Sequence, residues 1–243
     1  MGIGRCARSC SRRRDVFLNM ILFIHIFERL TSITMAHLDN LSVGVFIDGG
    51  YYANINEGLQ AKGMASGVNL KALFSYLLDH ISSKFKIERR LLFITEAHYY
   101  RGRFRAQDAL NMDLLQVERE FEDTLIENDV IFHYKHLRVN KDKGGVIEKG
   151  IDTWFALDTY EMTLFREFDY VVLISGDADH EMLARKLKAL KTHVVLLTWD
   201  PANTGSTSRF LSEEVCTHIS LNTLTANDAN LLKRITTPLK ASK

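Results

Sequence analysis

The chain has 243 residues, of which 46% are hydrophobic and 25% are charged, and it contains only two prolines. This composition is typical of one globular domain with a full core, and it excludes a long disordered or low-complexity protein. The net charge of +1 is unevenly distributed, because residues 1–34 hold six arginines against only Asp15 and Glu28. The rest of the chain is therefore mildly acidic. This excludes a general polyanion binder and leaves a local basic patch for any contact with nucleic acid.

The N-terminal segment, residues 1–34, shows no clear membrane or export signal. Its apolar run at 16–27 is shorter than the ~20 residues of a membrane span, and no small-residue cleavage site of a signal peptide follows it. We therefore expect no membrane association, and interpret 1–34 as an extended gene start or a disordered tail before a native start at Met35. The predicted domain covers 35–225, and 226–243 is a predicted C-terminal tail.

The three cysteines, Cys6, Cys10 and Cys216, do not form a disulfide framework. So few cysteines are typical of a reducing compartment, so we expect a cytoplasmic protein. Cys6 and Cys10 have no Cys or His partners at zinc spacing, which disfavours a zinc site.

Within the predicted domain, short apolar runs alternate with stretches in which apolar residues recur at helical spacing. We expect strands at 43–47, 90–95, 130–134, 170–174 and 193–197. We expect helices at 69–81 with Asn69 as N-cap, at 106–128, at 151–165 and at 180–190. The predicted inward positions of the second and fourth helices are Leu110, Leu114, Val117, Phe121, Leu125, Met182, Leu183, Leu187 and Leu190. Residues 49–67 and 200–208 have loop composition, and 210–221 fits a short helix and strand.

This alternation of strands and helices indicates βαβ units. It therefore predicts an α/β fold with a doubly wound, mostly parallel sheet flanked by helices. The runs at 43–47 and 170–174 are almost wholly apolar, as central strands buried on both faces are. If these two strands are neighbours, the switch point of the sheet lies between them, and ligands bind at that point in such folds.

Four aspartates fall where this fold would bring them to one edge: Asp48, Asp152, Asp177 and Asp179. The C-terminal ends of parallel strands and the N-terminal ends of the following helices share that edge. Carboxylates gathered there repel one another unless a hard cation such as Mg²⁺ or Mn²⁺ lies between them. We therefore predict that these four residues are the metal ligands and catalytic residues of a Mg²⁺ or Mn²⁺ site. Taken singly, each also has a simpler interpretation as a turn former or helix cap.

Three segments resemble the NYN domain, the LabA-like branch of the PIN-like ribonuclease superfamily. They are Val-Phe-Ile-Asp-Gly-Gly-Tyr at 45–51, Glu-Lys-Gly-Ile-Asp at 148–152 and Val-Val-Leu-Ile-Ser-Gly-Asp-Ala-Asp-His at 171–180. With a weaker match at 207–221, the resemblance spans roughly 42–221. It implies a Rossmann-like sheet with strand order 3-2-1-4-5, a divalent-metal site formed by the same four aspartates, and cleavage of single-stranded RNA.

One position departs from the family pattern. Many members carry Asn three residues after the first acid, where this chain has Tyr51. Asn54 is a candidate substitute, and Tyr51 itself either stacks on a base or only closes the core. Ser175 is a candidate to hydrogen-bond a ligand carboxylate or a phosphate oxygen.

Two groups of basic residues near the predicted acidic edge are candidates to bind RNA. The first comprises Lys149, Arg138, Lys141 and Lys143. The second comprises Arg101 and Arg103, interleaved with Tyr99, Tyr100 and Phe104, which offer charge and base-stacking surface. Lysine-rich loops are also commonly just solvated.

Two functions remain open from the sequence. One is a divalent-metal-dependent endoribonuclease that hydrolyses phosphodiester bonds of single-stranded RNA, which the complete acid set favours. The alternative is a non-catalytic RNA-binding or protein-binding regulatory module, which Tyr51 and the lack of net positive charge favour. A phosphatase is disfavoured because Asp48-Gly49-Gly50 lacks the second Asp of an Asp-x-Asp nucleophile motif. The sequence leaves a homo-oligomer possible.

Overall fold

The computed structural model describes residues 40–140 and 145–239, and the chain from Leu41 onward forms one compact unit. The predicted N-terminal segment 1–34 lies outside the described residues, as do Lys141 and Lys143. Within the described ranges, no helix combines the length and the apolar character that a membrane crossing requires.

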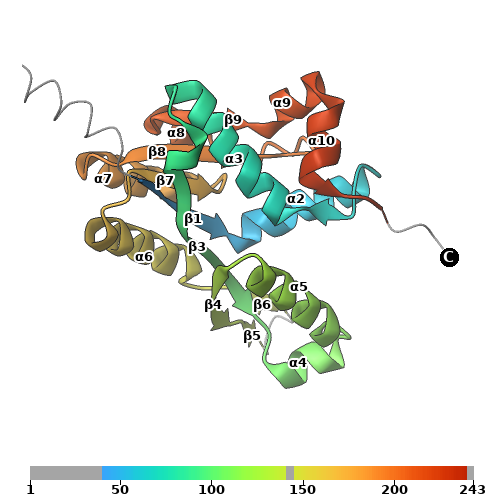
Figure 1. The fold of residues 1–243 in the computed structure, drawn as a ribbon. Coiled ribbons are helices and arrows are strands. Elements are labelled where there is room, and N and C mark those ends of the chain that lie inside the picture. Colours follow the sequence, from blue (N-terminus) through green and yellow to red (C-terminus); the bar gives the residue numbers. More distant parts are fainter. Residues whose placement is uncertain (1–39, 141–144, 240–243) are drawn as a thin grey trace, which may run out of the picture. The chain divides into compact units, whose positions relative to one another are not determined.

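A six-stranded sheet in which every neighbouring pair is parallel forms the centre of the unit (Figure 1). In spatial order its strands are β4 (Val130–His136), β3 (Leu92–Arg103), β1 (Leu41–Asp48), β7 (Tyr170–Ile174), β8 (His193–Thr198) and β9 (Thr217–Ser220). When the strands of this sheet are numbered along the chain, the first five, β1, β3, β4, β7 and β8, lie in the predicted order 3-2-1-4-5. β1 and β7 are neighbours, so the switch point lies between them as expected.

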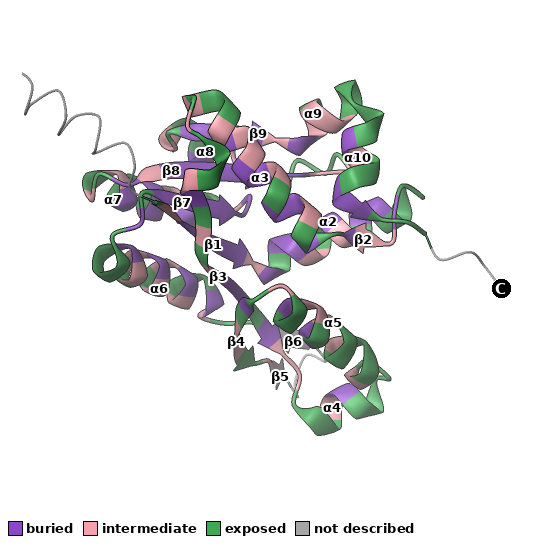
Figure 2. Ribbon diagram, in the orientation of Figure 1, coloured by how far each residue is buried: buried purple, intermediate pink, exposed green. Residues whose placement is uncertain are grey.

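Helices cover both faces of this sheet. One face packs against α2 (Gly49–Ala61), α3 (Leu70–Phe85), α5 (Leu115–Glu127), α9 (Leu221–Asn227) and α10 (Ala229–Ile235). The other packs against α6 (Ile151–Arg166), α7 (Glu181–Ala189) and α8 (Arg209–Glu214). Buried residues concentrate on the strands and on the helix faces turned toward them (Figure 2). The fold class is therefore the predicted doubly wound α/β arrangement.

Shorter elements connect these layers. They are the 3-10 turns η1 (Arg89–Leu91) and η2 (Ala178–His180), helix α4 (Ala106–Asn111), and the strands β2 (Gly67–Val68), β5 (Arg138–Asn140), β6 (Gly145–Ile147) and β10 (Thr236–Thr237). β5 pairs antiparallel with β6, and β2 pairs antiparallel with β10. α8 and β9 occupy the stretch where a short helix and strand were expected.

Helix α3 follows its sequence signals closely. The side chain of Asn69 accepts a hydrogen bond from the backbone N–H of Ala72, so it caps the helix as predicted. The apolar positions at helical spacing are all buried: Leu70, Leu73, Phe74, Leu77, Leu78 and Ile81.

The expectation of a loop across 49–67 is wrong, because residues 49–61 form α2. The Asp48 carboxylate caps this helix by accepting hydrogen bonds from the backbone N–H groups of Gly50 and Tyr51. The buried positions Tyr52, Ile55 and Leu59 supply a helical apolar face. Two glycines at the start of the segment hid this spacing in the sequence.

The single helix expected at 106–128 is also wrong, because the chain forms α4 and α5 with a break between them. Asp113 adopts a left-handed conformation with φ of 58°. The backbone N–H of Leu114 donates to the carbonyl oxygen of Ala109, and the backbone N–H of Asp113 donates to the carbonyl oxygen of Leu110. This pair of bonds is a helix-ending Schellman motif, and an aspartate tolerates the left-handed position better than most residues. Of the predicted inward face only Leu125 is buried, while Val117 is 62% exposed.

Three further expectations differ from the structure. The second strand extends to Arg103, well past the predicted end at 95. Met182 was expected to face inward on α7 and is 53% exposed. The stretch 226–243, expected as a tail, contributes α10 and β10, and Ile235 is fully buried in the core. These residues supply apolar contacts that a tail would lack, so the folded unit continues past 225.

Two histidines on the neighbouring strands β3 and β4 should make the stability of the fold depend on pH. Nδ1 of His98 lies 3.0 Å from Nε2 of His133, and burial lowers the pKa of both rings below the ordinary value. The unfolded chain therefore binds more protons below about pH 6.5, so stability is full above that pH and falls as the pH drops. We expect the melting temperature to fall between about pH 7.5 and 5.5, and His133→Gln to make this fall smaller. An equal fall in both proteins, measured by circular dichroism, contradicts the prediction.

Candidate functional site

A cleft of about 460 Å³ opens at the carboxyl ends of β1 and β7. Its lining includes Asp48 at the end of β1, Asp177 after β7, and Asp152 in the first turn of α6. Three of the four predicted acids therefore share one cleft at the switch point of the sheet. The lining also includes Glu148 and Asn54.

The Asp48 carboxylate is held in place by three hydrogen bonds. Its Oδ1 accepts from the backbone N–H of Gly50 at 3.0 Å and from that of Tyr51 at 3.1 Å. Its Oδ2 accepts from the hydroxyl of Ser175 at 3.0 Å. The simpler interpretation of Asp48 as a helix cap is thus correct, and the cap fixes the carboxylate at the wall of the cleft.

Ser175 is fully buried, and all the hydrogen-bonding capacity of its hydroxyl is used. It donates its proton to Asp48 and accepts from the backbone N–H of Asp177 at 3.2 Å. Its remaining contact is with Nδ1 of His180 at 2.9 Å. Because the hydroxyl proton is already given to Asp48, Nδ1 carries the proton of that contact. The hydroxyl therefore ties the ends of β1 and β7 and the start of α7 together.

His180 is 1% exposed, and its ring packs against Phe155 with centroids 4.5 Å apart. Nε2 of this buried ring has no hydrogen-bond partner among the described residues. The sequence places His180 directly after Asp179, and the fold brings its ring to the hydroxyl of Ser175.

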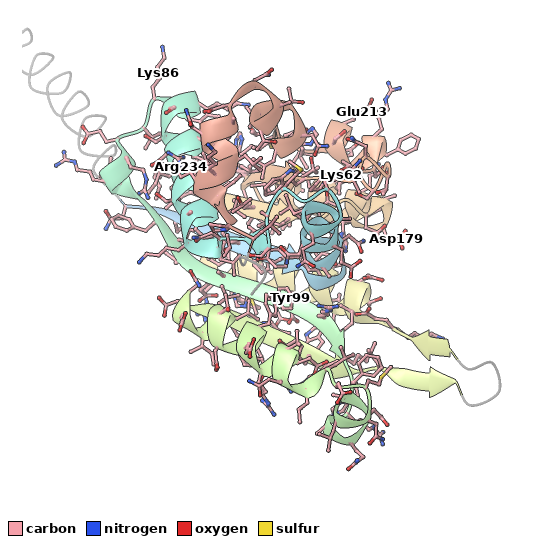
Figure 3. All side chains as sticks on the ribbon, turned by 90° about the vertical axis from the view of Figure 1, so that its right-hand side faces the viewer. Lys62, Lys86, Tyr99, Asp179, Glu213 and Arg234 are labelled. Atoms are coloured by element: carbon pink, nitrogen blue, oxygen red, sulfur yellow. The ribbon has the colours of Figure 1, made fainter. Side chains whose placement is uncertain are left out.

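The charges of the four aspartates act on one another. The pKa of Asp152 is raised above its ordinary value, first by partial burial, then by the negative charge of Asp48, with smaller contributions from Asp177 and Asp179, while His180 opposes the shift. Asp179 is exposed and is not part of the cleft lining, and Figure 3 shows it at the periphery of the molecule. Its backbone N–H bonds to Oδ1 of Asp177, so it belongs to the turn that positions Asp177.

The chemistry of these side chains fits a hard divalent cation. No hydrogen bond from a described residue occupies Asp152 or Oδ2 of Asp177, so carboxylate oxygens are free at the cleft. Within 40–140 and 145–239, no three His, Cys, Asp or Glu residues are close enough to hold one ion together. Mg²⁺ is usually bound through one or two carboxylates, with water and substrate phosphates completing its shell. The arrangement fits that mode better than a cage built only from protein ligands.

Tyr51 is 5% exposed, and its hydroxyl is fully engaged. It accepts a hydrogen bond from the backbone N–H of Trp199 at 3.0 Å and lies 3.1 Å from Oγ1 of Thr207. Burial raises the pKa of this hydroxyl. The geometry favours the alternative in which Tyr51 closes the core, since its ring offers little free surface to a base. Its role in RNA binding stays a prediction.

Asn54 is exposed on α2, one turn beyond Tyr51, and it lines the cleft. Because Asn54 lies on a helix, its position at the site is fixed, which a flexible loop would not achieve. Asn54 is the residue that the sequence suggests as a substitute for the family Asn. Glu148 is a lining acid that sequence reasoning did not select, although it begins the matched segment 148–152. Its Oε1 accepts from the backbone N–H of Gly102 at 2.5 Å.

The predicted RNA-binding residues fall in different environments. Lys149 is exposed and lies directly before Gly150, the N-cap of α6, whose second residue is Asp152. Arg103 is engaged in ion pairs with Glu118 and Glu122, which fix α5 against the sheet. The rings of Tyr99 and Tyr100, expected to help form a stacking surface, are 1% and 0% exposed. The side chain of Arg138 and residues Lys141 and Lys143 lie outside what the structure describes.

A parallel sheet of this order, with acids at its switch point, defines a protein of the PIN-like kind. Residues 42–222 match the model of the NYN domain family, so the chain belongs to the NYN domain family. Among solved structures, the chain resembles VPA0982 of Vibrio parahaemolyticus, a protein of unknown function. The TM-score is 0.52 at 15% identity, over 76% of this chain and 94% of that chain. At this identity the likeness shows the fold alone. No curated protein matches the sequence.

The role of Tyr51 can be tested with Tyr51→Phe, which keeps the ring and removes the hydroxyl. We expect a loss of about 1–3 kcal/mol in unfolding free energy, because the buried N–H of Trp199 loses its acceptor. Urea denaturation followed by tryptophan fluorescence measures the loss. A variant as stable as the parent would contradict the proposed structural role.

Proposed function

We propose that this protein is a divalent-metal-dependent endoribonuclease of the LabA-like branch, which hydrolyses phosphodiester bonds of single-stranded RNA in the cytoplasm. The main observation in support is that Asp48, Asp152 and Asp177 line one cleft at the switch point of a PIN-like sheet. The pKa of Asp152, raised first by burial and then by the negative charge of Asp48, is consistent with the proposal, because a bound cation would stabilise the ionised carboxylate.

In this proposal, Asp152 and Asp177 hold Mg²⁺ or Mn²⁺ through their free oxygens, and Asp48 and Asp179 complete the site directly or through water. The ion, when bound, supplies an activated water and neutralises charge on the phosphoryl oxygens. The N-terminus of α6 favours the ionised form of Asp152. In this proposal, exposed Lys149, three residues before Asp152, contacts a backbone phosphate. Asn54, which also lines the cleft, orients water or phosphate.

The alternative function is a regulatory module that binds RNA or protein without cleaving it. The observation that favours it is Tyr51, which occupies the position of the family Asn and is locked into the core. Cleavage and binding assays separate the two functions, because a binding module retains RNA without shortening it.

Replacement of Asp177 by Asn tests the nuclease proposal. We expect Mn²⁺-dependent cleavage of a labelled single-stranded RNA by the parent, and a loss of about 100-fold or more in the variant, since several kcal/mol of transition-state stabilisation depend on the ion. Asp123→Asn, which changes an exposed aspartate on α5, is the matched control and should cleave normally. Cleavage that survives in Asp177→Asn at the parental rate rules out the proposed site.

Ser175→Ala tests whether the buried hydroxyl positions the acids. The variant keeps all four carboxylates but releases Asp48 and the turn at Asp177, so we expect metal affinity or activity to fall about 10–100-fold. The informative readout is the Mn²⁺ concentration for half-maximal cleavage, which a general loss of stability would not shift. Ser42→Ala serves as the control. Ser42 lies at the start of β1, and the substitution removes its hydroxyl, which hydrogen-bonds the carboxylate of Asp169. An unchanged Mn²⁺ midpoint in Ser175→Ala argues against the positioning role.

A further inference from the structure

A second cavity, of about 540 Å³, lies on the sheet face covered by α2 and α5. Five aromatic side chains line it: Tyr52 from α2, Tyr99 from β3, Phe121 from α5, Tyr134 from β4, and Phe104 from the loop after β3. The rings other than Phe104 pack together, with Tyr99 5.3 Å from Phe121, 6.0 Å from Tyr52 and 6.5 Å from Tyr134 between centroids. In Figure 3 Tyr99 lies in the interior of the molecule. The cavity thus has an apolar, aromatic wall that does not belong to the acidic cleft.

Glu148 connects the two cavities, because it lines both of them. Its Oε1 is fixed by the backbone N–H of Gly102 near the end of β3. On the same strand end, Arg101 lies one residue beyond Tyr100, the residue that pairs with Asp48 across β1 and β3. The acidic cleft and the aromatic cavity are therefore adjacent, with Glu148 between them and Arg101 on the side of the aromatic cavity.

The charges in this cavity disfavour a phosphate as its occupant. Four carboxylates line it, those of Glu57, Glu118, Glu122 and Glu148, against the guanidinium groups of Arg101 and Arg103. Arg103 is already paired with Glu118 at 3.3 Å and Glu122 at 2.7 Å. A neutral, flat and aromatic group suits such a lining better than an anion.

Arg101 differs from Arg103 because no described carboxylate lies at ion-pair distance from it. The residue is exposed, and its guanidinium contacts the hydroxyl of Tyr99 in the cavity wall. A guanidinium plane of this kind stacks on nucleobases and hydrogen-bonds their edges.

We propose that this aromatic cavity binds one nucleobase of a single-stranded RNA whose phosphate lies in the adjacent acidic cleft. Arg101 and Phe104 contact the base, and the rings of Tyr52 and Tyr99, which are 2% and 1% exposed, support the cavity wall from inside the core without stacking on the base. The inference rests on the proposed ribonuclease function. In it, the base is recognised by residues on the sheet face that α2 and α5 cover.

Binding of two labelled strands tests the proposal. The full chain carrying Asp177→Asn, in Mg²⁺, is titrated with oligoadenylate and with a strand of equal length that lacks bases. Fluorescence anisotropy reports the affinities, and a gel confirms that the strands stay intact. We expect the oligoadenylate to bind about 5–100-fold more tightly, because stacking of one base contributes about 1–3 kcal/mol.

Two substitutions locate this preference. Arg101→Gln and Phe104→Leu, each added to the same background, should bring the ratio of the two affinities close to one. Arg105→Gln removes the same charge from an exposed residue outside the cavity lining, and should keep the ratio. Thermal melts verify that all variants fold. A parental ratio of one, or a ratio unchanged in both cavity variants, overturns the proposal.

Cleavage by the unmodified chain is scored separately, which distinguishes failure of this inference from failure of the proposed function. If the chain prefers the base-bearing strand through Arg101 and Phe104 but cuts no RNA, the base site is supported and the nuclease proposal is rejected. If the chain cuts RNA but shows no base preference, the nuclease proposal is supported and the base site is rejected.

Discussion

The buried hydroxyl of Ser175 is the contact on which the candidate site depends. It makes three hydrogen bonds, to the Asp48 carboxylate, the backbone of Asp177 and the ring of His180. Since a hydroxyl has one proton and two lone pairs, these three bonds use it completely and fix the direction of each. The ends of the two central strands are therefore locked together at the switch point. A carboxylate that is held in this way keeps its position when a cation or phosphate arrives, which is the preorganisation that catalysis at such a site requires.

The simple and the functional interpretations of the aspartates are compatible. Asp48 caps α2 and Asp177 caps the turn at 178–180, as isolated aspartates at strand ends commonly do. Each cap uses only one oxygen of its carboxylate, so the contacts of the cap leave acceptor capacity on the other oxygen. The same backbone N–H groups that stabilise the charge also set its direction. A cluster of capping aspartates thus becomes a candidate cation site when the sheet brings the caps to one edge.

Several features of the fold follow from local signals and were predictable. The alternation of strands and helices, the cap at Asn69 and the buried face of α3 depend on apolar spacing and on residues a few positions apart. The strand order was implied by the resemblance to the NYN domain, and the sheet has that order. Helix α2 was missed because two glycines follow Asp48, and the break before α5 was missed because the left-handed Asp113 interrupts an otherwise helical pattern. Tyr99 and Tyr100 were expected on a stacking surface and are buried, whereas Met182 was expected inward and is exposed. The exposure of a side chain depends on which element packs against it, and the local sequence does not specify that element.

The sequence by itself determined that a parallel α/β sheet forms and that acids end its central strands, since both depend on periodicity within short segments. Tertiary structure alone decided how those acids are held and what surrounds them. The bond between Ser175 and Asp48 joins residues 127 positions apart, and that between Trp199 and Tyr51 joins residues 148 apart. The aromatic cavity likewise gathers side chains from α2, β3, β4 and α5. Such contacts arise only when the layers pack, because no local pattern encodes which distant side chain becomes a neighbour.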